Sequence, residues 1–209
     1  MPGAPATPPE SSVTEGVTSL EVRWILPGEL DIAVAECFRQ LRQETESRQD
    51  TYLLSPGMGG LSVKVRGGRA LDVKVYLGSP GVLEVPGRAR GRLQSWRKWS
   101  FPFRPDNQDS SERPGWWPVG KTRRISRFSL GSGTVSAELT EVRARGRAWW
   151  SLGFEAIGPV GLLRNELEAT AAHVFARALP DGVQLRVDDS RSYAEWLHGQ
   201  LSADAEMGT

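Results

Sequence analysis

The sequence of 209 residues predicts an α+β protein whose antiparallel sheet of about eight strands forms a closed or nearly closed β-barrel, with helices packed outside. Three observations predict this fold. Short segments of alternating apolar and polar residues recur along the chain and are joined by hairpin-length links. Charged residues of both signs occupy the middle of several such segments. Three other segments carry apolar residues at helical spacing. If the helices cover the apolar faces, the charged faces of the strands line a tunnel.

The central pair of strands lies in Leu61 to Leu77, where two alternating runs flank a turn rich in glycine. A loop of three residues, 67–69, brings the apolar faces together and sets Lys64 opposite Asp72. Alternation alone favours an open sheet with one face in water. The placement of both charge signs at mid-strand in several strands favours a tunnel instead, because solvent faces more often carry uncharged polar residues. Lining a lumen with charge costs desolvation unless water and an ionic ligand occupy it.

Composition limits the classes of function. The chain has 26 Lys and Arg against 25 Asp and Glu, so its net charge of +1 argues against nucleic acid or an anionic membrane as the partner. A single cysteine, Cys37, excludes an internal disulfide and suits a reducing, cytoplasmic location. No apolar run approaches the length of a membrane-spanning helix. Two histidines offer little for a soft-metal site or a Ser-His-Asp arrangement.

The segments before the central hairpin are assigned in order. Residues 1–16 are rich in Pro, Ser and Thr and predict a disordered tail. Thr18 to Leu26 alternates, with Glu21 and Arg23 on its polar face. Asp31 to Glu44 has a helical apolar stripe, and 48–57 is strand-like up to a Pro-Gly turn.

The segments after the hairpin complete a single domain over 17–201. Residues 88–99 are basic and aromatic and suggest a covering helix that runs into a strand, and 104–117 form a turn-rich, mobile insertion. Three strands follow, at 121–130, 134–145 and 147–157; in the last, Trp150 faces the core and Trp149 a pocket. A helix is predicted over 160–179, and a capping box at Ser192 starts a final helix that frays over 202–209.

The order of these elements resembles that of the CYTH, or triphosphate tunnel, superfamily over roughly residues 18–178. The matching pieces are LEVRWIL, a helix, RQDTYL, SVKVR, LDVKV, ELTEVR and WWSLGFEA. The resemblance implies an eight-stranded tunnel in which basic residues bind a triphosphate, and glutamates bind Mg²⁺ or Mn²⁺ for hydrolysis. It implies phosphate ligands at Lys64, Arg66 and Lys74, with Arg48, Arg124 and Arg143 as further candidates. It also implies metal ligands at Glu21 and Glu155, supported by Glu138 or Glu141, and places Tyr52 at the tunnel mouth.

The opening strand departs from the ExExK signature of that superfamily. Glu21 keeps the first carboxylate, but Arg23 stands at the second and Ile25 at the lysine. A guanidinium removes a metal ligand and adds a repelling charge, and Arg23 is also a candidate to take the cation's place against phosphate. Two functions follow. The first is binding of an anionic, phosphorylated small molecule of triphosphate or nucleotide type, with hydrolysis by a metal-dependent triphosphate phosphohydrolase if the protein is an enzyme. The alternative is a catalytically inactive interaction or scaffold protein.

Overall fold

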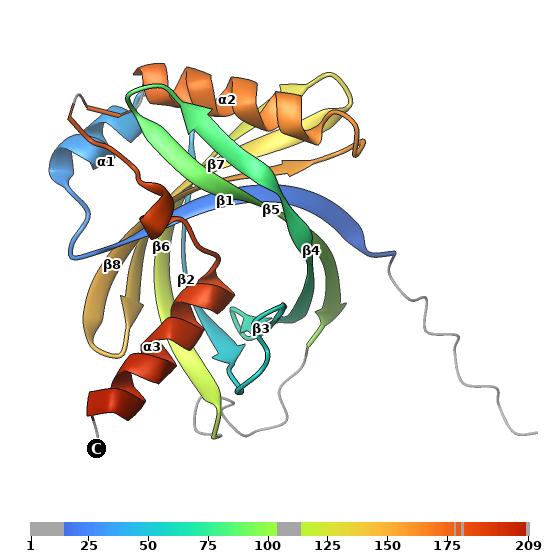
Figure 1. The fold of residues 1–209 in the computed structure, drawn as a ribbon, viewed down its shortest axis with the longest axis vertical. Helices are drawn as coiled ribbons and strands as arrows, with labels where there is room; N and C mark the ends of the chain where they lie inside the picture. Colours follow the sequence, from blue (N-terminus) through green and yellow to red (C-terminus); the bar gives the residue numbers. More distant parts are fainter. Residues whose placement is uncertain (1–14, 104–113, 178, 181, 208–209) are drawn as a thin grey trace, which may run out of the picture.

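The computed structural model describes residues 15–103, 114–177, 179–180 and 182–207, and its sheet is a closed antiparallel barrel in the order β1-β5-β4-β3-β2-β6-β7-β8 (Figure 1). The predicted fold class is therefore confirmed. The strands are β1 (Val17–Pro27), β2 (Glu44–Leu53), β3 (Leu61–Arg66), β4 (Ala70–Val85), β5 (Ala89–Pro102), β6 (Trp116–Leu130), β7 (Gly133–Ala144) and β8 (Arg147–Ile157). Pairing of β1 with both β5 and β8 closes the barrel.

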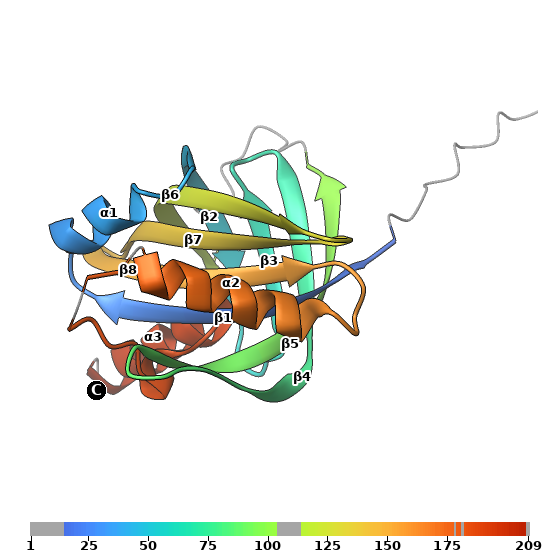
Figure 2. The same cartoon turned by 90° about the horizontal axis from the view of Figure 1, so that it is seen from above.

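In the described ranges, three α-helices accompany the barrel: α1 (Ile32–Phe38), α2 (Leu163–Arg177) and α3 (Tyr193–Met207). In Figures 1 and 2, α2 lies along the outside of the barrel and α3 lies on another side, near one end. A short 3₁₀ helix, Val187–Asp189, precedes α3. Ser192 caps α3 as predicted: its hydroxyl accepts from the Glu195 amide, and the Glu195 carboxylate accepts from the Ser192 amide.

The main core fills the space between α2 and the outer face of the sheet. Trp24 is fully buried there, packs edge-on against Phe175 at 6.0 Å, and donates its indole N–H to the Arg90 carbonyl at 3.0 Å. The apolar face predicted for the first strand is thus the outer face of the barrel. Because side chains alternate along a strand, its charged residues must point inward.

The central hairpin has the predicted register. Lys64 lies opposite Asp72, Val63 lies opposite Val73, and Arg66 pairs with Ala70 across a three-residue loop. Gly67 and Gly68 in that loop both have positive φ angles, which a residue with a side chain rarely adopts. The parity argument from the sequence is therefore sufficient to set the register of these two strands.

A second apolar cluster lies at one end of the barrel, under α3. It combines inward-facing residues of several strands with Trp196 and Leu197 of α3, both fully buried. Ile25 stands where the ExExK signature has its lysine. It belongs to this second cluster, so that position lies in an apolar plug. The cluster leaves the rest of the interior to the charged side chains.

Some element boundaries differ from the prediction. The helix expected over 31–44 ends at Phe38, and β2 already begins at Glu44. Residues 89–102 form strand β5 throughout, so a helix over 88–99 is wrong; small residues, Ala89 and Gly91, at buried positions hide the alternation. Helix α3 continues to Met207, beyond the expected fraying at 202. The expected insertion falls largely on 104–113, outside the described residues, as do residues 1–14 of the tail.

Of the helices in the described part of the chain, none combines the length and apolar character that crossing a membrane would require.

Candidate functional site

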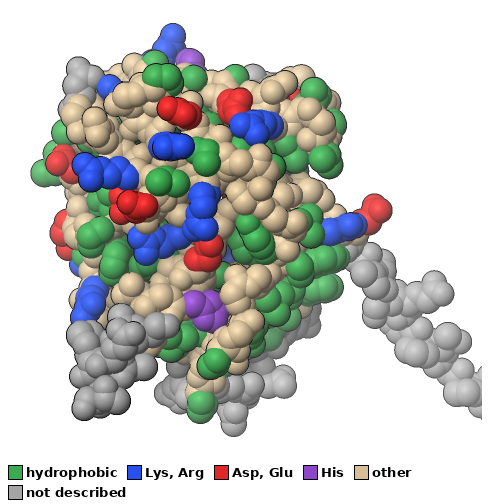
Figure 3. Space-filling model, in the orientation of Figure 1, with side chains coloured by type: hydrophobic (Ala, Val, Ile, Leu, Met, Phe, Trp, Pro, Cys, Tyr) green, Lys and Arg blue, Asp and Glu red, His purple; other side chains and the backbone are tan. Residues whose placement is uncertain are grey.

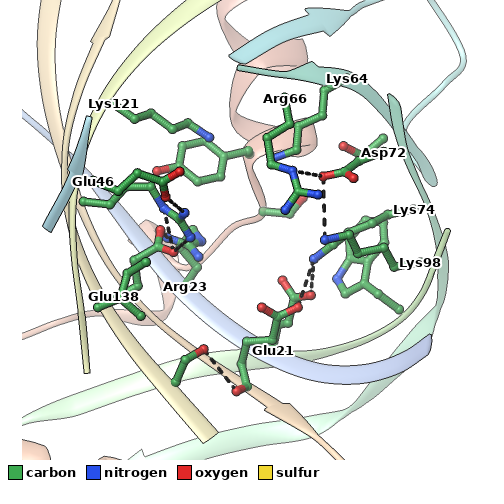
Figure 4. A pocket seen from close by; sticks show the side chains of 18 of the residues that line it. Glu21, Arg23, Glu46, Lys64, Arg66, Asp72, Lys74, Lys98, Lys121 and Glu138 are labelled. Carbon is green, nitrogen blue, oxygen red and sulfur yellow. Dashed lines mark hydrogen bonds and ion pairs between the residues drawn. The ribbon is translucent and has the colours of Figure 1, made fainter. Parts of the chain in front are cut away.

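The barrel encloses a cavity of about 680 Å³ lined mainly by charged side chains, here called the barrel cavity. Figure 4 shows charged residues from strands around the barrel pointing into one central space. Each is on the face that alternation assigns to the interior. Among the described residues, nine Lys and Arg side chains line the cavity against six Asp and Glu side chains. The cationic ones are Arg23, Arg48, Lys64, Arg66, Lys74, Lys98, Lys121, Arg123 and Arg127, and the acidic ones are Glu21, Glu44, Glu46, Asp72, Glu138 and Glu155.

Asp50 lies behind this lining and holds three of the cations. Its fully buried carboxylate is 2.9 Å from Arg48 Nε, 3.0 Å from Lys64 Nζ and 3.1 Å from Lys121 Nζ. Burial disfavours its ionised form, but Lys64, Lys121 and Arg48 outweigh burial and lower the pKa of Asp50. We call these four residues the Asp50 cluster. Arg48 also pairs with Glu46 at 2.8 Å, so three positive charges face two negative ones and the cluster keeps a positive excess.

Lys121 is the most enclosed cation of this cluster. Its ammonium donates to the Tyr52 hydroxyl at 2.6 Å and lies 3.6 Å from the centre of the Tyr193 ring. Burial lowers the pKa of Lys121, and the nearby Lys64 charge contributes in the same direction. An anion entering the cavity would relieve this repulsion.

Asp72 on β4 holds a second group of donors. Its buried carboxylate accepts from the Ser100 hydroxyl at 2.6 Å and lies 3.4 Å from Arg66 Nε and 3.6 Å from Lys98 Nζ. Burial lowers the pKa of Lys98. We call this the Asp72 cluster. It also has more cations than carboxylates, and it lies beside the Asp50 cluster because Lys64 and Asp72 are directly paired.

Arg23 is held in place from several sides. Its Nη1 is 3.1 Å from Glu138 and 3.2 Å from the Ser151 hydroxyl, and its guanidinium lies 4.8 Å from the centre of the Tyr193 ring. Across the β1–β8 pair it lies opposite Gly153, where a Cβ atom would come within 2.8 Å of the guanidinium carbon. The absence of a side chain at 153 therefore leaves the space that Arg23 fills.

Glu21 and Glu155 are directly opposite each other on β1 and β8 and share the ammonium of Lys74. The Lys74 charge lowers the pKa of Glu155 to about 2, whereas burial raises the pKa of Glu21. Both glutamates raise the pKa of Lys74 against the effect of burial. Lys74 thus occupies the position between the two carboxylates that a bound cation would need.

The carboxylates of the cavity do not fit a divalent metal ion. Mg²⁺ and Mn²⁺ prefer near-octahedral coordination by several oxygen atoms. Within the described ranges, no group of three or more His, Cys, Asp and Glu side chains is arranged to hold a metal. Glu21 and Glu155 are bonded to Lys74. Glu138, which the resemblance implies as a supporting metal ligand, is bonded to Arg23 and Arg123.

Glu138 provides a test of the cavity's ion pairs. Burial opposes its ionisation, but Arg23 and Arg123 hold the pKa of Glu138 well below its ordinary value of 4.5. A lowered pKa stabilises the folded protein above pH 4.5, and this contribution is lost as the pH falls through the folded-state pKa. We expect Glu138→Gln to lower the urea midpoint at pH 7 and to lose this difference on acidification below pH 4.5. Parallel curves for variant and wild type from pH 7 to 3 would contradict the assignment.

Several cavity residues were not predicted from the sequence. Lys121 and Arg123 lie on β6, where basic residues on both faces hide the orientation, and Tyr193 comes from α3. Trp96 on β5 also lines the cavity; it is 2% exposed, and its indole nitrogen has no hydrogen-bond partner among the described residues. The nitrogen itself is buried, so it does not contribute a donor to the surface of the cavity.

The predicted ligands divide between the two faces of the barrel. Arg23, Arg48, Lys64, Arg66, Lys74, Glu21 and Glu155 line the cavity together with Tyr52. Arg124 and Arg143 do not; they pair with Glu141 and Glu29 at 2.8 Å. Strand alternation explains the difference, because Arg123 and Val142, their neighbours, take the inward positions. On the face in Figure 3, cationic and anionic side chains are interspersed.

A second, smaller cavity of about 180 Å³ lies where β6, β8 and α3 meet. It is lined by Trp117, Trp149 and Trp196, with Arg145 and Arg147 beside them. The indole of Trp149 packs edge-on against that of Trp196 at 5.3 Å. Trp149 therefore lines a pocket and Trp150 is buried in the main core, as the alternation predicts.

Comparisons with known proteins give structural neighbours only. No family model and no curated protein sequence matches the chain. The structure of the PH1819 protein of Pyrococcus horikoshii OT3 is similar to this one; the match covers 87% of this chain and 99% of PH1819, with 15% identity and a TM-score of 0.43. The S. pombe Pct1 RNA triphosphatase is similar over 78% of this chain and 82% of its own. Its complex with the Spt5 CTD gives 11% identity and a TM-score of 0.38, and the enzyme alone gives 9% and 0.35. At these values, membership of the triphosphate tunnel superfamily stays a prediction from the sequence.

Proposed function

We propose that the protein binds a small phosphorylated anion, of triphosphate or nucleotide type, inside the barrel cavity. The observation that carries this proposal is that the Asp50 and Asp72 clusters bring five cations into one cavity with three carboxylates as their partners, Asp50, Asp72 and Glu46. An excess of buried cations is unfavourable unless an anion completes it. Phosphate oxygens accept several charge-assisted hydrogen bonds at once and therefore suit this arrangement.

The size and donors of the cavity support the same class of ligand. A volume of about 680 Å³ is within the range of roughly 300–1,000 Å³ typical of small-molecule sites. Arg66 offers planar donors for bidentate contact, and Lys64 and Lys98 offer point charges. A chain of linked phosphates would contact donors from both clusters.

Titration calorimetry with inorganic tripolyphosphate tests the proposal. We expect saturable binding that weakens with added salt, because the contacts are ionic. Lys64→Met removes one cation of the cavity, so we expect affinity to fall at least roughly tenfold, the value of a hydrogen bond to a charged group.

Arg143→Gln is the matched control, because this exposed arginine lies outside the cavity and pairs with Glu29. Its affinity for tripolyphosphate should equal that of wild type. If wild type shows no heat with millimolar tripolyphosphate or ATP, the proposal is wrong, and the interaction or scaffold alternative is the function to pursue.

A further inference from the structure

We infer that the cavity binds its phosphorylated ligand without a divalent cation, because Lys74 and Arg23 act as built-in cations at its carboxylates. This inference rests on the proposed function and specifies its cofactor requirement. It departs from the expectation of Mg²⁺ or Mn²⁺ at Glu21 and Glu155. The basis is the arrangement of donors on β1, β4 and β8.

Lys74 lies between the two glutamates that face each other across β1 and β8. Its Nζ atom bonds to Glu21 and lies 3.4 Å from Glu155, and its side chain is about four-fifths buried. An incoming metal ion would have to displace this ammonium and leave it buried among other cations. Since Lys74 is covalently part of β4, it competes with a dissolved ion at a very high effective concentration.

Arg23 has the same effect on the third carboxylate. It bonds to Glu138, which also accepts from Arg123, so two guanidinium groups neutralise this carboxylate. Gly153 is the feature that makes the arrangement specific, because any side chain there would meet the guanidinium of Arg23. The Tyr193 ring covers the guanidinium from another side. Arg23 is therefore seated in a position shaped for it.

Figure 4 shows how these built-in cations relate to the ligand space. Lys74 and Arg23 come from different walls of the barrel and point inward with Lys98, Arg66 and Lys121. A phosphate group in this space would contact cations on several sides. In sites that use Mg²⁺, the ion supplies this neutralisation between carboxylates and phosphate oxygens. Here the chain supplies it directly.

Two measurements test the inference. In the first, tripolyphosphate is titrated into the full chain in EDTA and in excess Mg²⁺, with free tripolyphosphate as the reference concentration. We expect affinity in EDTA equal to or higher than that in Mg²⁺. Binding at least tenfold tighter in Mg²⁺ would overturn the inference while leaving the proposed function intact. Absence of binding in both buffers would overturn both.

The second measurement needs no phosphorylated ligand. Mn²⁺ is titrated into the protein and free Mn²⁺ is followed by electron paramagnetic resonance. We expect no stoichiometric binding to wild type at 100 μM Mn²⁺ (roughly the range in which a partly formed carboxylate site begins to fill). The double variant Lys74→Met/Arg23→Gln frees the carboxylates of Glu21 and Glu155 and removes one of the two guanidinium groups at Glu138, and it should bind Mn²⁺ at least tenfold more tightly.

Lys64→Met is the matched control for the Mn²⁺ titration, because it removes a lysine of the same cavity at Asp50 and frees no glutamate pair. It should bind Mn²⁺ no better than wild type. Circular dichroism establishes that each variant is folded. If the double variant does not fold, the wild-type titration alone tests the inference. Stoichiometric Mn²⁺ binding to wild type would contradict the role of Lys74 and Arg23 as built-in cations, and absence of such binding would support it.

Discussion

Asp50→Asn is expected to lower the free energy of unfolding by about 3–5 kcal/mol, the range for removing one partner of a buried ion pair. The carboxylate is fully buried and contacts Arg48, Lys64 and Lys121. Asparagine keeps the size of the side chain but leaves three neighbouring cations without their shared negative charge. Urea denaturation at pH 7, followed by circular dichroism, measures the loss.

Glu29→Gln is the control for Asp50, because its partner Arg143 and Glu29 itself are both more than three-fifths exposed. Its loss should not exceed about 1 kcal/mol. The pKa of Asp50 is lowered, so its stabilisation is present above its ordinary pKa of 3.8 and fades as the pH falls. The difference between variant and wild type should therefore shrink in acid. A loss under about 1 kcal/mol at pH 7 would contradict the role assigned to Asp50.

Trp196→Ala is expected to cost about 3–5 kcal/mol and to release α3 from the barrel. The indole is 1% exposed and contacts Trp149 and Tyr193 in the apolar plug. Since the first turn of α3 brings Tyr193 onto Lys121 and Arg23, its release should also weaken tripolyphosphate binding.

Hydrogen exchange of the α3 amides distinguishes local release from general destabilisation. We expect Trp196→Ala to lose protection in 193–201 first, with β1, β7 and β8 still protected in mild conditions. Leu162→Ala, at a side chain 45% exposed, is the control and should leave α3 protected. Unchanged exchange in the Trp196 variant would show that α3 is held by other contacts.

The parts of the fold that the sequence predicts best are those with strict alternation. The register of β3 and β4 follows from counting loop residues, and that register places Lys64, Arg66 and Lys74 on one face. Closure of the barrel makes this face the interior. The orientation of β1 and β8 follows similarly from their long apolar faces. These predictions need only local geometry, so tertiary contacts have little opportunity to overturn them.

The parts that the sequence leaves open depend on distant contacts. Basic residues occupy both faces of β6, and only pairing with β2 and β7 turns Arg123 inward and Arg124 outward. Small buried residues in β5 weaken its alternation. Asp50 follows Arg48 in a polar run, and nothing local indicates that it would gather Lys64 and Lys121 from two other strands. The plug under α3 likewise joins segments from both ends of the chain.

Closure of the barrel sets the order in which this chain can fold. One edge of strand β1 pairs with β5 and the other with β8, where Val22 lies opposite Phe154. The β1–β8 ladder therefore cannot form until the late strand β8 is present. Contacts between such distant positions make folding slow, typically milliseconds to seconds, because a long loop must close before they form. During synthesis the first strand stays without its β8 partner until Ile157 has left the ribosome. Chaperone dependence of the nascent chain should therefore persist until both β8 and α2, which covers the main core, have emerged.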